Sequence, residues 1–217
     1  MSNEISLFQK AGLPAPTTLA TALKSLDTAV GTVGVTILKM DKTGHWVFGA
    51  DQTEVEDDST WAVNPFSFIH GFIAWGAGEV LGEKMGPVTQ PLPEIGPAPE
   101  AAKKGWETQV GFSLKCVNGE DAGLEARYTV TSVGGKRAVQ GLAAAIAAQV
   151  ETNSEQPVPV VRLKKEHYQH KMYGRIFTPI FEIVGWVNLD GNATSGEAVE
   201  APAGEDAAPG RRRRRGA

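Results

Sequence analysis

The chain has 217 residues, of which 41% are hydrophobic, and its formal net charge is −4. This length and composition predict one globular domain with appendages. The single cysteine, Cys116, excludes an intramolecular disulfide framework and a cysteine-based zinc site, and its alternating surroundings indicate a buried thiol in a strand. No apolar run approaches the ~20 residues of a membrane span and no signal peptide is visible, so we expect a cytoplasmic protein.

The charges are unevenly distributed along the chain. Residues 1–102 hold five Lys/Arg against twelve Asp/Glu, whereas residues 103–176 hold eleven Lys/Arg against seven Asp/Glu. This asymmetry favours a basic face on an acidic body, and the alternative is an ordinary mixed surface.

The N-terminal part of the chain predicts an arm followed by a hairpin. Residues 1–32 contain a short leucine stripe after two prolines, which indicates a loosely attached arm with one helix or, equally well, a disordered leader. Residues 33–49 predict a β-hairpin with Asp-Lys-Thr-Gly as its turn. The acidic loop 54–58 that follows is interpreted as a solvated loop, with a divalent-metal site as the alternative.

An apolar and aromatic stretch, residues 61–76, breaks at Asn64-Pro65 and continues as a strand from Phe68, with a return strand ending at Val88. His70 in this strand is expected to be a core histidine with a partner rather than a ligand. Residues 86–105 contain five prolines and predict a long surface loop.

The remaining elements are predicted as strands 109–117 and 124–131, a helix 136–150, and strands 159–164 and 176–187. In the helix, Val139, Leu142, Ile146 and Val150 form one apolar stripe. Between the last two strands lies a connection rich in cations and rings. Ahead of the helix, Gly134 and Gly135 precede Lys136 and Arg137, an arrangement that could hold a phosphate or could be a plain turn.

These elements predict a mainly β protein with an OB-fold-like, five-stranded barrel at residues 33–190, in which the hairpin 33–49 is an extension and the helix lies between the third and fourth strands. Residues 191–217 consist mainly of small and acidic residues and end in Arg211–Arg215, which predicts a disordered tail. The arginines could attract nucleic acid or fold back onto the acidic half of the chain.

Three segments resemble a family of bacteriophage and prophage proteins related to single-stranded DNA-binding proteins of the OB type: GFSLKCVNGEDAG, TSVGGKRAV and YQHKMYGRIFTPIFEIVGW. The similarity covers roughly residues 33–190. It implies non-enzymatic binding of single-stranded DNA during phage replication or recombination, in the cytoplasm of a bacterial host. The five terminal arginines depart from the acidic tail with which many such proteins recruit partners.

We therefore predict a cationic groove with stacking rings and no cofactor or metal. Trp75 and Trp106 are additional candidate rings. Further expected partners are phage replication or recombination proteins, and self-association is compatible with the sequence. The predicted nucleic-acid-binding residues are Lys115, Arg127, Tyr128, Lys136, Arg137, Arg162, Lys164, Lys165, Tyr168, Lys171, Tyr173, Arg175 and Phe177.

Two other classes of function stay open. One is a phage protein-interaction or inhibitory factor that uses the acidic N-terminal half. The other is a nuclease using Glu56, Asp57 and Asp58, which the sequence disfavours because these carboxylates are neighbours in one loop without a basic catalytic partner.

Overall fold

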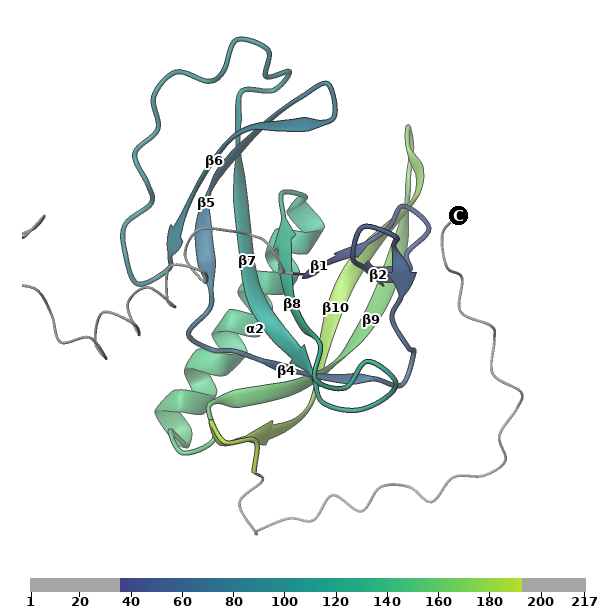
Figure 1. Ribbon diagram of the computed structural model, residues 1–217, viewed down its shortest axis with the longest axis vertical. Coiled ribbons are helices and arrows are strands. Elements are labelled where there is room, and N and C mark those ends of the chain that lie inside the picture. The colour runs from purple at the N-terminus through teal and green to yellow at the C-terminus, as the bar shows by residue number, and fades with distance from the viewer. Residues whose placement is uncertain (1–35, 193–217) are drawn as a thin grey trace, which may run out of the picture. The chain divides into compact units, whose positions relative to one another are not determined.

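The structure, a computed structural model, describes residues 36–192 (Figure 1). Within this range it contains a ten-stranded sheet and one helix, which confirms the prediction of a mainly β protein with one well-defined helix. The predicted arm, residues 1–32, and the tail from residue 193 onward lie outside the described residues. The elements are β1 (Thr36–Met40), β2 (Trp46–Phe48), β3 (Thr53–Glu54), β4 (Thr60–Val63), β5 (Ile69–Gly76), β6 (Glu79–Pro87), β7 (Trp106–Cys116), β8 (Glu125–Val130), α2 (Val133–Thr152), β9 (Val158–His170) and β10 (Gly174–Val187).

The strands follow the order β10-β9-β4-β7-β8-β1-β2-β3. The long strand β7 pairs with β8 along one edge and with both β4 and β5 along the other, and β6 pairs with β5. All of these ladders are antiparallel except the one between β1 and β8. The sheet ends at β10 on one side and at β3 on the other, so it is curled but not closed by backbone pairing (Figure 1).

The prediction of a five-stranded barrel is therefore wrong in its strand count. Strand β4, which lies between β9 and β7, precedes Phe68, where the sequence predicts the first barrel strand to begin. The described part of the predicted hairpin, residues 36–49, also belongs to the sheet rather than forming an extension, because residues 36–38 pair with residues 126–128 of β8. This pairing satisfies backbone groups that would otherwise remain exposed on the edge of β8.

The turn between β1 and β2 is organised by Asp41, as the Asp-Lys-Thr-Gly pattern predicts. Its Oδ1 atom accepts hydrogen bonds from the backbone N–H groups of Thr43 and His45, each at 2.8 Å. Burial raises the pKa of this carboxyl, but the hydrogen bonds from His45 and Thr43 outweigh burial and place the pKa below its ordinary value. Gly44 completes the turn with a φ of +81°, and its backbone lies against the ring of Phe177 on β10.

The inner face of the sheet carries the core. Alternation along the strands turns four side chains inward: Trp61 of β4 and Phe112, Leu114 and Cys116 of β7. Each of them is at most 2% exposed. The prediction of a buried Cys116 thiol is therefore confirmed. A ring cluster, which we define as Trp46, Phe112, Tyr128 and Phe181, joins four strands. The Phe181 centroid lies 5.1 to 5.7 Å from the centroids of the other three rings.

Helix α2 begins at Val133, three residues before the predicted start, because the Ser132 hydroxyl caps it by accepting a hydrogen bond from Gly135 N–H. The predicted stripe is buried at Val139, Leu142 and Ile146, but Val150, near the end of the helix, is 41% exposed. A Cβ atom on Gly134 would collide with Thr178 of β10, and one on Gly135 would collide with Val130 of β8. The two glycines thus allow the helix to begin between β8 and β10.

The proline-rich loop between β6 and β7 is held in place by side chains of the adjacent strands. Trp106 Nε1 donates to the Gly96 carbonyl at 3.0 Å, Lys84 Nζ donates to the Glu94 carbonyl at 2.9 Å, and His70 Nε2 lies 2.9 Å from the Gln90 carbonyl. His70 is thus a half-buried histidine with a backbone partner.

A pair of glycine substitutions in α2 tests the packing of its first turn. We expect Gly135→Ala to lower the free energy of unfolding by about 1–3 kcal/mol, because the new methyl group collides with Val130. Gly141→Ala is the matched control: no atom lies within 4 Å of its added Cβ, so the better helix propensity of alanine should stabilise the protein by about 0.5–1 kcal/mol. Urea unfolding measures both effects, and an unchanged stability of Gly135→Ala would contradict the packing described here.

Candidate nucleic-acid interface

Strands β9 and β10 continue beyond the rest of the sheet as a two-stranded ribbon. Strand β9 pairs with β4 only at residues 160–162, whereas it pairs with β10 from Val158 to His170. Figure 1 shows the paired ends of the two strands extending past β4. The sequence predicts an irregular connection over residues 165–175, but both strands run through it and only residues 171–173 form the turn. Cross-strand pairs such as Tyr168 with Ile176 and His167 with Phe177 favour this continuation.

The β9–β10 ribbon, which we define as residues 164–178, is cationic. It carries Lys164, Lys165, Lys171 and Arg175 against one acidic residue, Glu166, together with two histidines. Glu166 accepts a hydrogen bond from the Thr178 hydroxyl across the ladder at 3.2 Å. Such an excess of cations on a narrow protrusion favours contact with a polyanion.

The tip of the ribbon exposes large apolar and aromatic side chains. Met172 is 81% exposed, Tyr173 is 73% exposed and Tyr168 is 50% exposed. The ring of Tyr173 stacks on that of His170, with centroids 4.8 Å apart and an interplanar angle of 28°. Exposed, stacked rings beside cations are the features with which proteins bind single-stranded nucleic acid.

Phe177 lies near the base of the ribbon and is half-buried. Its ring packs against Gly44, and Lys165 Nζ lies 5.5 Å from its centroid. The His167 ring lies 5.7 Å away. These contacts hold the ribbon against the β1–β2 turn and leave part of the Phe177 ring accessible.

The predicted residues of the ribbon divide between its two faces. Because residues directly opposite in an antiparallel ladder share a face, Arg162, Lys164 and Tyr168 lie on one side. Lys165, Arg175 and Phe177 lie on the other side, which continues the core-facing side of Leu163 and Phe181. The structure therefore presents a two-sided ribbon in place of the single groove predicted from the sequence.

Tyr128 is 3% exposed and belongs to the ring cluster of the core, so its ring is not accessible for base stacking and we leave it out of the interface. Alternation along β8 places Tyr128 on one face of the strand but does not determine whether that face is buried. In the structure that face is turned toward the core.

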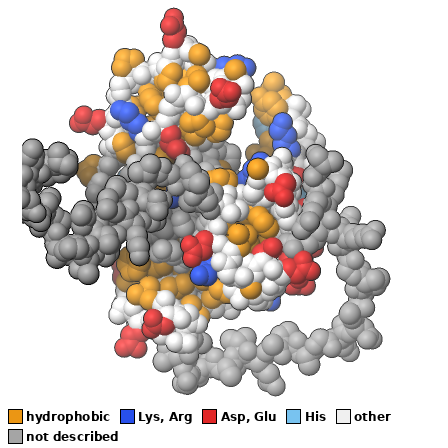
Figure 2. All heavy atoms as spheres, viewed as in Figure 1, with side chains coloured by type: hydrophobic (Ala, Val, Ile, Leu, Met, Phe, Trp, Pro, Cys, Tyr) orange, Lys and Arg blue, Asp and Glu red, His pale blue; other side chains and the backbone are white. Residues whose placement is uncertain are grey.

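The other predicted residues lie away from the ribbon. On the outer face of β7 and β8, Lys115 forms a 3.2 Å ion pair with Glu125 and Arg127 is half-buried. In the first turn of α2, Lys136 donates to the Thr108 hydroxyl at 2.7 Å and Arg137 is exposed. The amides of Gly135 and Lys136 bond to Ser132, so they are already used by the helix cap. On the visible described part of the face in Figure 2, basic and acidic side chains are interspersed.

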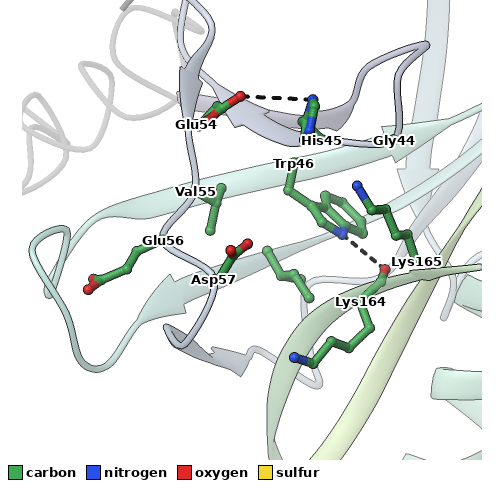
Figure 3. Close-up of a pocket in the computed structure, with 10 residues that line it drawn as sticks. Gly44, His45, Trp46, Glu54, Val55, Glu56, Asp57, Lys164 and Lys165 are labelled. Atoms are coloured by element: carbon green, nitrogen blue, oxygen red, sulfur yellow. Dashed lines mark hydrogen bonds and ion pairs between the residues drawn. The ribbon is translucent and has the colours of Figure 1, made fainter. Parts of the chain in front are cut away.

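Trp46 is a residue of the site that the sequence reasoning missed. Its indole Nε1 donates to the Lys164 carbonyl at 3.0 Å, which connects β2 with the base of the ribbon (Figure 3). Beside this bond lies a cavity of about 310 Å³, which we name the seam cavity. No sequence signal links its parts, because residues 118 positions apart meet there. It is lined by Gly44, His45, Trp46, Glu54, Val55, Glu56, Asp57, Leu163, Lys164 and Lys165.

Across residues 36–192, no group of three or more His, Cys, Asp or Glu side chains is arranged to hold a metal ion. In the acidic loop, the Glu56 carboxylate instead accepts a hydrogen bond from the backbone N–H of Glu120 at 3.0 Å and thereby fixes the turn between β7 and β8. No helix in the described part of the chain is long and apolar enough to cross a membrane.

Comparison of the chain with protein-family models, with curated proteins and with solved structures gives no match.

The buried phenol of Tyr128 gives a testable dependence of stability on pH. Burial raises its pKa well above the ordinary value of 10.0, so above pH 10 the unfolded chain loses this proton while the native protein keeps it. Native stability should therefore be complete below pH 10 and fall as the pH rises above it. We expect Tyr128→Phe to lessen that fall by about 1.4 kcal/mol between pH 8 and 11.

Urea unfolding at pH 8, 10 and 11 measures this difference. Tyr168→Phe, at an exposed ring, is the control and should follow the native protein. A Tyr128→Phe variant that loses as much stability above pH 10 as the native protein would contradict the assignment.

Proposed function

We propose that this chain binds single-stranded DNA without catalysing a reaction, and that the β9–β10 ribbon is its principal contact. The observation that carries the proposal is the combination on this ribbon of four Lys/Arg side chains with exposed Tyr168 and Tyr173. The ammonium and guanidinium groups attract phosphates, and each neutralised phosphate releases counterions. The rings stack on the unpaired bases of a single strand. The bases of a duplex are stacked on one another and are not accessible to the rings.

The strand order supports a relationship to the OB type of single-stranded DNA-binding protein. Strands β4, β7 and β8 precede the helix and β9 and β10 follow it, with β4 adjacent to β9. This is the order of a Greek-key barrel with a helix between its third and fourth strands. In such a barrel the first turn of α2, which lies between Val130 and Thr178, would occupy the gap between β8 and β10.

The biological setting follows from the sequence resemblance. We propose that the protein acts in phage DNA replication or recombination in the cytoplasm of a bacterial host. Within the described residues, the interface consists of Arg162, Lys164, Lys165, Tyr168, Lys171, Tyr173, Arg175 and Phe177, with Lys115, Arg127, Lys136 and Arg137 as more distant contacts for a longer strand.

The direct test is fluorescence anisotropy of the full chain with labelled single-stranded and duplex DNA of one sequence across a salt series. We expect tighter binding of the single strand, with a logarithmic salt slope of roughly −0.7 for each phosphate contacted. Absence of single-strand binding at low salt would refute the proposal and would direct attention to a protein partner. Equal affinity for the duplex would refute the role of stacking.

Substitution at the tip of the ribbon tests which ring makes contact. We expect Tyr173→Ala to weaken single-strand binding by roughly 5- to 150-fold, since stacking on one base contributes about 1–3 kcal/mol. Tyr173→Phe, which keeps the aromatic ring, should retain most of the affinity. Because Tyr173 is 73% exposed, its thermal unfolding midpoint should stay close to that of the native protein. A folded Tyr173→Ala variant with native affinity would remove this ring from the interface.

A further inference from the structure

The seam cavity opens at the base of the β9–β10 ribbon, where a nucleic-acid strand bound to the ribbon would pass. Lys164 and Lys165 contribute to both the ribbon and the wall of the cavity. Its volume of about 310 Å³ is at the lower end of the range of small-ligand sites, which suits a ligand as small as one nucleotide.

The three carboxylates of the cavity wall differ in their hydrogen-bond and ion-pair partners. Glu54 lies 3.8 Å from His45, and Glu56 accepts the backbone hydrogen bond of Glu120. In Figure 3 the Asp57 carboxylate points toward the side of the cavity occupied by Trp46 and Lys164, whereas Glu56 points away. Within residues 36–192 the Asp57 carboxylate makes no hydrogen bond or ion pair. It is therefore available to accept hydrogen bonds from a ligand.

The opposite wall of the cavity supplies one ammonium group, that of Lys165. The main chain of Lys164 is held by the Trp46 indole, and the Lys165 side chain extends from the same strand beside the indole (Figure 3). An acceptor on one side and the Lys165 ammonium group on the other complement a nucleotide. The phosphates of a nucleotide accept hydrogen bonds from lysine, and its base can carry an amino group. A base that presents only a carbonyl oxygen toward Asp57 would be repelled by it.

We propose that the seam cavity selects among pyrimidines, and accepts cytosine over thymine, by a hydrogen bond from the cytosine amino group to Asp57. Carboxylates accept from the N4 amino group of cytosine, whereas thymine has the O4 acceptor at that position. This proposal rests on the proposed single-strand binding and adds a base preference to it. Lys165 holds an adjacent phosphate, so the cavity distinguishes the base while the other cations and the rings of the ribbon supply affinity.

The experiment compares oligodeoxycytidine, oligothymidine and oligodeoxyuridine of equal length at pH 7.5, with the full chain and anisotropy as the readout. We expect the cytidine strand to bind at least about fivefold more tightly than either of the others. Deoxyuridine has the O4 acceptor of thymine without its methyl group, so it separates hydrogen bonding from exclusion of the methyl. Binding of deoxyuridine as tightly as cytidine would overturn the proposal.

Two variants with the same change in charge locate the effect. Asp57→Asn replaces the acceptor by an amide that can also donate to O4, so the ratio of cytidine to thymidine affinity should fall to near one. Asp58→Asn alters the neighbouring residue, which does not line the cavity, and should keep the native ratio. Equal loss of the ratio in both variants would overturn the role of Asp57.

The native protein separates failure of this inference from failure of the proposed function. Equal, salt-dependent binding of all three strands would overturn the base preference alone and leave single-strand binding in place. Absence of binding to every strand would overturn both.

Discussion

Four aromatic rings pack together from strands that lie far apart in the sheet order. Trp46, Phe112, Tyr128 and Phe181 come from β2, β7, β8 and β10, which span the strand order almost from end to end. Because no backbone ladder among residues 36–192 closes the sheet, burial of these rings maintains its curl. The Trp46 hydrogen bond to Lys164 adds a polar contact at the point where β2 meets β9.

This curl also creates the candidate site. It brings the acidic loop before β4 next to the start of the cationic ribbon, so Asp57 and Lys164 line the same cavity although 107 positions separate their numbers. The acidic and basic parts of the chain are therefore not separated in space as they are in the sequence. Around the base of the ribbon both signs are present, and farther along it cations and rings dominate.

Local patterns accounted for individual elements well. The Asp-Lys-Thr-Gly turn, the strands around Cys116 and Tyr128, and the stripe of α2 all follow from short-range chemistry or periodicity. The misplaced features are those in which local signals are ambiguous. Residues 165–170 combine charges with rings and lack apolar alternation, so they resemble a connection, but cross-strand pairing with β10 makes them a strand. Tyr128 alternates with Arg127, and alternation alone does not say which face becomes the core.

Composition and short-period patterns were enough to predict the mainly β class, the position of the helix, the burial of Cys116 and the concentration of cations and rings between residues 162 and 177. Four features became visible in the folded chain alone: the parallel pairing of β1 with β8, the burial of Tyr128, the division of the ribbon into two faces, and the cavity that both Asp57 and Lys164 line. These features depend on packing and strand pairing between residues that are not neighbours in the chain. A short window of sequence does not contain both partners of such a contact, so its pattern does not predict them.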